Sequence, residues 1–165
     1  MSRLGVQPGL AVLVAAYLLA GLPPAASAAA SSPRDVVRLL NAARARNGAP
    51  PLRRDPLLTV AAGRHSRDMV RHRYFSHDSR TGGRFSTRIA RTGWMRPRRR
   101  WRVGETLAWG TGAKGTPRSV VAAWLASADH RRIVLDRRFR VVGIGIAVGT
   151  PFGAGRTFTA DFGSR

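Results

Sequence analysis

Apolar residues recur at helical spacing in several stretches of the chain. The first stretch begins at Ser32-Pro33, a capping hydroxyl followed by proline at the first helical position, and ends at Asn47-Gly48. Asp55-Pro56 repeats this start signal before a second stretch from Leu57 to about His72, which carries arginines on its polar side. These patterns predict two amphipathic helices.

Two more helices are predicted further along the chain. A shorter one spans Phe85 to Thr92, and a fourth begins at Thr116-Pro117 and breaks near Ala128. A short turn that carries His130 follows the break. Between these helices we expect irregular chain, consisting of an arginine-rich loop over 94–103, the segment 104–108, and a Gly/Thr-rich linker through Gly115.

The period changes near the C-terminus. Residues 141–148 and 157–162 are rich in β-branched and aromatic residues and flank a Gly/Pro loop, which predicts a hairpin in a sheet covered by the helices. Gly143 and Gly145 lie on one face of the first strand, so we expect a large side chain or a backbone to approach closely there.

The first 28 residues have the pattern of a secretory signal peptide. Arg3 supplies a positive start, residues 10–22 are apolar but shorter than the roughly 20 residues of a spanning helix, and Ala26-Ser27-Ala28 fits the cleavage rule. We expect export, a short leader over residues 29–34, and one domain over residues 35–165. An uncleaved membrane anchor is the alternative. No later stretch is long and apolar enough to cross a membrane.

Composition adds two constraints. The chain has no cysteine, so an exported domain must be stabilised by its core rather than by disulfides, which favours a bacterial secretory route. It has 29 Lys+Arg against 8 Asp+Glu and a net charge of +21, and Lys114 is the only lysine. Such a field attracts polyanions, for example anionic lipid or cell-envelope polymers. A solubilising surface encoded by a GC-rich genome explains the same composition.

The arginine-rich loop is the densest part of this charge. Trp94 and Trp101 alternate with its arginines, Arg96, Arg98, Arg99, Arg100 and Arg102. Guanidinium and indole groups together can contact a polyanion. The other interpretation is a solvated loop whose tryptophans pack into the core. Export and the lack of a nucleic-acid-binding motif argue against nucleic acid as the partner.

One carboxylate and two histidines are the main candidates for chemistry. Glu105 is the only glutamate of the chain and lies in Gly104-Glu105-Thr106, between His77 and His130. Two imidazoles and one carboxylate are the minimum set for a divalent-metal site or for acid–base catalysis. Their local contexts make the case for a shared site.

The contexts of these three residues resemble one known family. In its ordered motifs the chain is similar to the CAP superfamily, also called SCP-like or cysteine-rich secretory proteins, and to its cysteine-free bacterial branch. The matching segments are Leu40 to Gly48 with Pro51-Leu52, Leu57 to Met69, Tyr74 to His77, Gly104 to Thr106, Trp124 to Leu135, Gly143 to Gly145, and Phe158 to Gly163.

The resemblance implies an α+β fold, a three-layer α-β-α sandwich with helices packed around a small antiparallel sheet. It also implies a cleft lined by a His/Glu/Glu/His tetrad, of which His77, Glu105 and His130 match three positions. The second glutamate falls at Ser127, which supplies no negative charge. In the family the two histidines can hold a divalent ion, often zinc, so His77 and His130 become candidate metal ligands.

Several roles for these residues stay open. Glu105 could ligate a metal, or it could accept the N–H of one imidazole and fix its tautomer. A buried network that only locks the loops together is the alternative. His65, Asp68 and His72 share a helical face, and we expect them at the surface rather than in a second metal site. Serines beside the histidines lack the elbow motif of a hydrolase.

Three functions compete at this stage. The first is a secreted CAP module, extracellular or envelope-associated, whose cleft binds a divalent metal or a small ligand such as a lipid, a sterol or a wall component. The second is a metal-dependent hydrolase or peptidase with Glu105 as base. The third is a polycationic envelope-binding protein without catalysis. Because Ser127 replaces the second carboxylate, we expect binding rather than catalysis.

Overall fold

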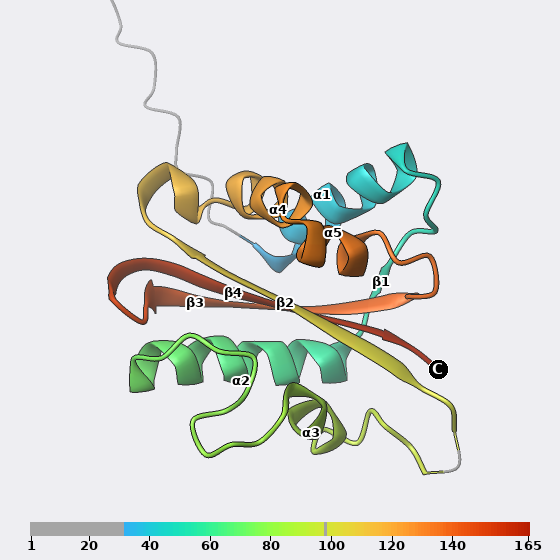
Figure 1. Cartoon of the computed structure of the whole chain (residues 1–165), viewed down its shortest axis with the longest axis horizontal. Coiled ribbons are helices and arrows are strands. Elements are labelled where there is room, and N and C mark those ends of the chain that lie inside the picture. The colour runs from blue at the N-terminus through green and yellow to red at the C-terminus, as the bar shows by residue number, and fades with distance from the viewer. Residues whose placement is uncertain (1–31, 98) are drawn as a thin grey trace, which may run out of the picture.

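The computed structural model describes residues 32–97 and 99–165, so the predicted signal peptide and Arg98 lie outside the described residues. The elements of this part of the chain, drawn in Figure 1, are α1 (Pro33–Arg46), β1 (Arg53–Arg54), α2 (Pro56–His72), α3 (Phe85–Ala90), β2 (Arg102–Gly110), the 3-10 helix η1 (Gly112–Gly115), α4 (Pro117–Ala126), α5 (Ala128–Val134), β3 (Val141–Thr150) and β4 (Gly153–Ser164).

The helix starts follow the predicted capping chemistry. Ser32, Asp55 and Thr116 each accept a hydrogen bond from a backbone N–H of the first turn, and each is followed by proline. The caps therefore set where α1, α2 and α4 begin. Within residues 32–97 and 99–165, no helix is both long enough and apolar enough to cross a bilayer.

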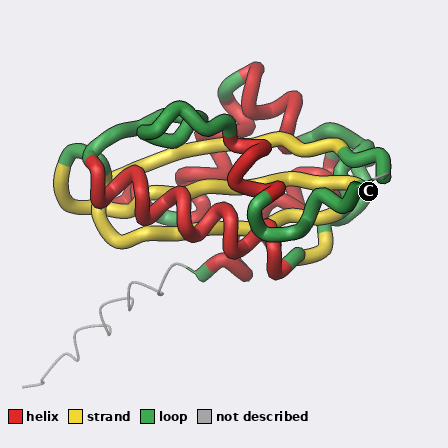
Figure 2. Tube along the Cα trace, turned by 90° about the horizontal axis from the view of Figure 1, so that it is seen from below, coloured by secondary structure: helices red, strands yellow, loops and turns green. Residues whose placement is uncertain are grey.

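A four-stranded sheet separates two helical layers. Its strand order is β1-β3-β4-β2; the β2–β4 and β3–β4 pairs are antiparallel, while the two-residue β1 pairs parallel with β3. Figure 1 shows α1, α4 and α5 on one face and α2 with α3 on the other, and Figure 2 shows α2 running along the strands. The predicted α-β-α sandwich is confirmed, with one parallel edge pair in its sheet.

Two predicted elements need correction. Residues 102–110 form the strand β2, whereas an arginine loop, a short segment and a linker were expected there. Glu105 and Thr106 are buried inside this strand, so its polar positions do not alternate with apolar ones as a half-exposed strand would require. His130 lies in the helix α5 rather than in a turn.

The face of the sheet under α1 and α4 carries the larger apolar core. Phe158, Ala160 and Phe162 of β4 project into it and are fully buried. Trp124 of α4 is 1% exposed, and its indole N–H donates to the carbonyl of Leu107 at 2.9 Å. Aromatic burial of this kind is the main source of stability in a domain without disulfides.

The opposite face has a smaller apolar cluster, which includes Leu58, Ile89 and Trp94, and beside it α2 packs on the sheet through backbone. A Cβ on Gly143 would lie 2.0 Å from the carbonyl carbon of Leu58, and a Cβ on Gly145 would lie 2.2 Å from the oxygen of Ala62. Both contacts belong to α2, so the predicted close approach at these glycines is confirmed. The missing side chains let α2 lie directly on β3.

One buried arginine links two distant parts of the chain. Arg44 in α1 is fully buried, and its guanidinium donates to the carbonyls of Pro50 at 2.8 Å, Val134 at 2.6 Å, Asp136 at 3.1 Å and Phe139 at 3.2 Å. Buried cations require such partners. Arg44 therefore fixes the segment after α1 against the segment between α5 and β3.

Candidate functional site

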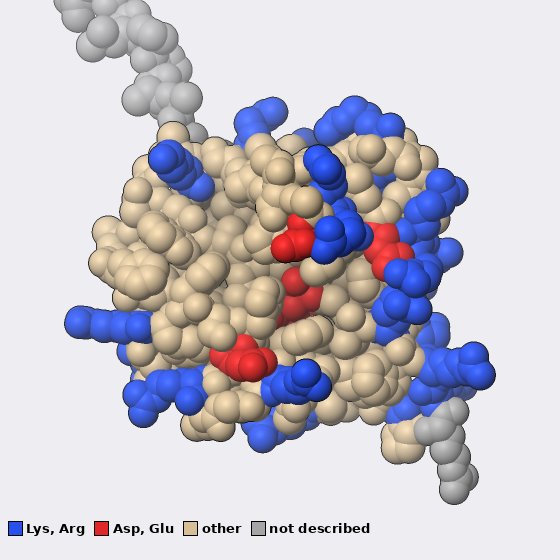
Figure 3. Space-filling view, viewed as in Figure 1, with Lys and Arg blue, Asp and Glu red and all other residues tan. Residues whose placement is uncertain are grey.

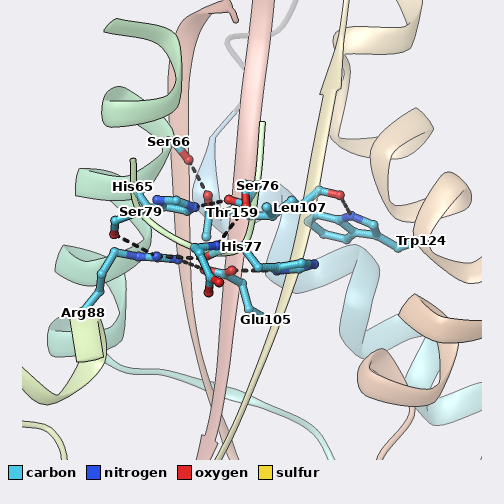
Figure 4. A network of polar contacts seen from close by, with 11 residues as sticks. His65, Ser66, Ser76, His77, Ser79, Arg88, Glu105, Leu107, Trp124 and Thr159 are labelled. Carbon is cyan, nitrogen blue, oxygen red and sulfur yellow. Dashed lines mark hydrogen bonds and ion pairs between the residues drawn. The ribbon is translucent and has the colours of Figure 1, made fainter. Parts of the chain in front are cut away.

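The pairing of His77 with Glu105 forms the centre of the site. Glu105 projects from β2 toward the α2 side of the sheet, its side chain is 1% exposed, and its Oε1 accepts the Nδ1–H of His77 at 2.8 Å. Figure 4 shows His77 beside Glu105, in the loop between α2 and α3. The His77 side chain is 51% exposed. Because Nδ1 is held, Nε2 is the nitrogen that remains for a ligand.

Arg88 occupies the other oxygen of the carboxylate. Its Nη2 donates to Glu105 Oε2 at 2.6 Å, and its Nη1 donates to the carbonyl of His77 at 2.7 Å and to Ser79 Oγ at 3.2 Å. Arg88 comes from α3 and is 12% exposed, so this is a largely buried, charge-assisted contact. It ties the His77 loop to the sheet.

A second carboxyl group lies beside Glu105. Asp161 of β4 is the register partner of Glu105 and is 1% exposed. Burial, and then the negative charge of Glu105, raise the pKa of Asp161 well above its ordinary value, so its neutral form is favoured. Its Oδ1 has no hydrogen-bond partner among the described residues. The site therefore places a carboxyl group that favours its neutral form directly beside Glu105.

His65 also belongs to this buried network. Its Nε2 donates to the carbonyl of Ser76 at 2.9 Å, while Nδ1 has no partner within the described chain. Burial lowers the pKa of His65, against the raising effect of Glu105. The expectation of a surface position is wrong for His65, which is fully buried, while Asp68 and His72 pair at the surface at 2.8 Å.

His130 and Ser127 stand to one side of this network. His130 is half-buried in α5, and burial and then the charge of His77 lower the pKa of His130. Ser127 is the N-cap residue of α5, but its side chain makes no capping hydrogen bond. A cavity of about 500 Å³ opens at His77 and Glu105, and neither Ser127 nor His130 lines it. Of the four predicted cleft residues, His77 and Glu105 line this cavity, and His130 is close enough to feel the charge of His77.

The donor set limits what metal the site could hold. Over residues 32–97 and 99–165, no group of three or more His, Cys, Asp or Glu side chains comes together as a metal site. Both oxygens of Glu105 are already engaged by His77 and Arg88. Glu105 thus fits the role of a carboxylate that orients an imidazole, and only His77 and His130 remain as protein ligands.

The two tryptophans of the arginine-rich loop, the predicted anion contact, differ from each other in burial. Trp94 is fully buried, and its indole N–H donates to Asp55 at 2.9 Å, whereas Trp101 is 47% exposed. The expectation that both pack into the core is wrong for Trp101. Arg96, Arg99 and Arg100 are exposed in the loop, and Arg102 begins β2 and lines the cavity at His77.

Arg88, Asp161 and His65 are the site residues that sequence reasoning missed. No local motif marks Arg88 as the partner of the lone glutamate among 29 basic residues. Asp161 was visible only as a polar residue in an apolar strand, and pairing it with Glu105 requires the β2–β4 register. The spacing of His65 placed it on the same helical face as His72, and the helix period does not tell which end of that face is covered.

A four-stranded sheet between two helical layers, with a His–Glu pair over one face, is an SCP-type architecture. The family model named CAP, the cysteine-rich secretory protein family, matches residues 37–162. The chain belongs to this family, although it contains no cysteine.

Two proteins from Bacillus species are similar to this chain in sequence. It is 34% identical over 121 residues to the protein YkwD of Bacillus subtilis, covering 73% of this chain and 44% of YkwD. An extracellular SCP-domain protein from Bacillus anthracis has a TM-score of 0.66 at 28% identity, over 78% of this chain and 39% of that one. This chain thus spans less than half of either relative.

An outer surface protein from Borrelia burgdorferi shares the fold alone. Its TM-score is 0.67 at 20% identity, over 80% of this chain and 91% of the Borrelia protein. The structural neighbours from B. anthracis and Borrelia are thus described as extracellular or outer surface proteins.

Proposed function

We propose that this chain is an extracellular CAP-domain binding protein that takes a divalent cation, with zinc as the best match, between His77 in the cleft and His130, which lies outside the cleft wall but within reach of the charge of His77. The observation that carries the proposal is the His77–Glu105 contact at 2.8 Å. A buried carboxylate on Nδ1 fixes the tautomer that leaves the Nε2 lone pair free, which is the form that binds metals.

The state of His130 supports the same role. A metal needs neutral imidazole, and the lowered pKa of His130 favours that form at neutral pH. Two protein ligands are fewer than the three of catalytic zinc sites, so the ion is bound weakly and exchangeably. A bound ion would supply a Lewis acid for a donor atom of a small ligand, such as a lipid head group, a sterol hydroxyl or a wall component.

The same contacts favour binding over hydrolysis. A general base must have a free lone pair within reach of the proton that it removes. Both oxygens of Glu105 accept hydrogen bonds, and its side chain is 1% exposed. Ser127 offers no second carboxylate in its place. We therefore assign Glu105 to the positioning of His77 rather than to catalysis.

Zinc titration of dialysed protein by calorimetry tests the proposal. We expect His77→Gln and His130→Gln each to abolish measurable binding, and Glu105→Gln to weaken it about 10- to 100-fold, as loss of an orienting partner does. His72→Gln is the matched control, because His72 is an exposed histidine outside the cleft. Unchanged zinc binding in the His77/His130 double variant would sink the proposal.

A further inference from the structure

A second cavity lies on the α2–α3 side of the molecule, apart from the proposed metal ligands. It has a volume of about 490 Å³ and opens between α2, the loop around Arg80, and α3. Small-molecule sites commonly have volumes of about 300–1,000 Å³. Neither His77 nor His130 lines this cavity, so its function can be separated from that of the cleft.

Four arginines line this cavity, and three of them lack an acceptor. Within the described chain, no side chain or carbonyl accepts from the guanidinium groups of Arg64, Arg80 and Arg91. The fourth, Arg88, is already paired with Glu105. Three unpaired cations around one concave space repel one another, and an anion in that space would remove the repulsion.

The one carboxylate that lines the cavity, Asp68, offsets only part of this charge. Asp68 accepts from His72 at 2.8 Å and also from the hydroxyl of Tyr74. Elsewhere in the described chain the scarce carboxylates do pair with arginines, as Asp136 does with Arg138 at 2.7 Å. The cavity thus concentrates positive charge in a chain that has only 8 acidic residues to distribute.

The lining contains a further polar group without a partner. His65, which is fully buried, borders the cavity, and its Nδ1 has neither donor nor acceptor among the described residues. Because Nε2 carries the proton, Nδ1 is an acceptor, and an unsatisfied acceptor beside a cavity points to a donor that the protein itself does not supply, such as a hydroxyl of a bound ligand. This observation is independent of the arginine count.

We propose that this cavity binds the phosphate group of a small phosphate monoester or diphosphate. Guanidinium groups present planar pairs of N–H donors that match phosphate oxygens, and three of them fit a doubly charged group better than a single carboxylate. The inference does not rest on the proposed metal cleft. Arg88 borders the cavity and also holds Glu105, so it lies between the two sites.

Calorimetry with inorganic pyrophosphate at fixed ionic strength, with a chelator present, tests the site. The variant Arg64→Gln/Arg80→Gln/Arg91→Gln should bind at least about 100-fold more weakly, because hydrogen bonds to charged groups contribute about 1.5–3 kcal/mol each and 1.4 kcal/mol is tenfold. All three side chains are exposed, so the variant should fold, as circular dichroism would verify.

A charge-matched control separates a site from general attraction. Arg34, Arg46 and Arg118 are exposed residues of α1 and α4, on the opposite side of the sheet. Their triple change to Gln removes the same charge and should change pyrophosphate affinity less than threefold. Figure 3 shows basic side chains around the rim of the molecule, so general attraction is the relevant competitor. Equal losses in both variants, or no binding by the wild type, would overturn the proposal.

Two further arms distinguish the source of the phosphate. Glycerol phosphate in solution and vesicles that contain phosphatidic acid present the same monoester group. Vesicle binding that is lost in the cavity variant but kept in the control assigns a lipid head group, and binding of glycerol phosphate alone assigns a soluble ligand. His77→Gln should leave pyrophosphate binding intact while removing zinc binding, so either proposal can fail without the other.

Discussion

Along β4, the two faces of the sheet are equally buried, but one carries apolar side chains and the other polar ones. On β4, Phe158, Ala160 and Phe162 project toward α1 and α4, and the residues between them, Thr159 and Asp161, project toward α2. All five are at most 1% exposed. Burial alone therefore does not separate core from site. The apolar side chains stabilise the domain, whereas the buried polar side chains surround Glu105 and its partners.

The two faces also differ in how closely the helices approach. Aromatic side chains keep α1 and α4 at a distance from the sheet, whereas Gly143 and Gly145 let α2 rest on β3. Close packing of backbone leaves little room for relaxation, while a side-chain core can partly rearrange around a change. An added side chain at the backbone contact should therefore prevent folding, whereas a side chain removed from the apolar core should lower the free energy of unfolding.

The largest effect should come from adding a side chain at the close contact. Gly145→Val places its Cβ about 2.2 Å from the carbonyl oxygen of Ala62, which is backbone and cannot rotate away. We expect no cooperative unfolding transition by circular dichroism. Gly63→Ala in the adjoining helix is the control, because its Cβ meets only the flexible end of Arg67 at 3.4 Å. It should stabilise by up to about 1 kcal/mol. A folded Gly145→Val would contradict the close packing.

A smaller but still large effect is expected from the apolar face. Phe158→Ala removes a fully buried ring and should lower the free energy of unfolding by about 3–5 kcal/mol in urea titrations. Phe152→Ala removes the same ring from the β3–β4 loop, where it is 69% exposed, and should change stability by less than about 1 kcal/mol. Equal effects of the two changes would mean that the apolar face does not carry the stability.

The smallest effect should appear only as a dependence on pH. The pKa of Asp161 is raised in the fold above its ordinary value of 3.8, so folded protein holds a proton that unfolded protein releases. Its contribution is therefore complete below pH 3.8 and is lost as the pH rises toward the raised pKa. Asp161→Asn keeps the shape without this titration, so the stability advantage of the wild type over the variant should shrink as the pH rises above 3.8.

Asp136 provides the opposite sign within the same protein. The hydrogen bond from Arg138 lowers the pKa of Asp136, so its contribution is present above the ordinary pKa and is lost as the pH falls. Asp136→Asn should therefore change stability near neutral pH and lose its effect in acid. Parallel pH profiles for the two variants would show that the environments of Asp161 and Asp136 do not differ in the sign of their effect.

The sequence predicted the layers of this fold better than the strand that carries the site. Caps at Ser32, Asp55 and Thr116 are local, so the starts of the helices followed directly. The strand β2 buries the side chain of Glu105 against Arg88 of α3, and no local pattern indicates such a partner. Its polar interior resembles a loop until the sheet is assembled.

The site was predicted as residue types rather than as contacts. The contexts of His77, Glu105 and His130 marked one neighbourhood, and the pair between His77 and Glu105 is present. Arg88 donates to the second oxygen of Glu105, and that contact depends on tertiary geometry alone. The role of a site residue depends on which of its atoms already have hydrogen-bond partners, and the residue type alone does not tell this.

The buried guanidinium of Arg44 has a consequence for the order in which the molecule comes apart. Two of its acceptors, Pro50 and Val134, lie 6 and 90 residues away along the chain. If either segment unfolded alone, the guanidinium of Arg44 would remain buried without some of its hydrogen-bond acceptors. Local opening of the segment after α1 is therefore coupled to local opening of the segment between α5 and β3. Amide hydrogen exchange should report both segments as one cooperative unit.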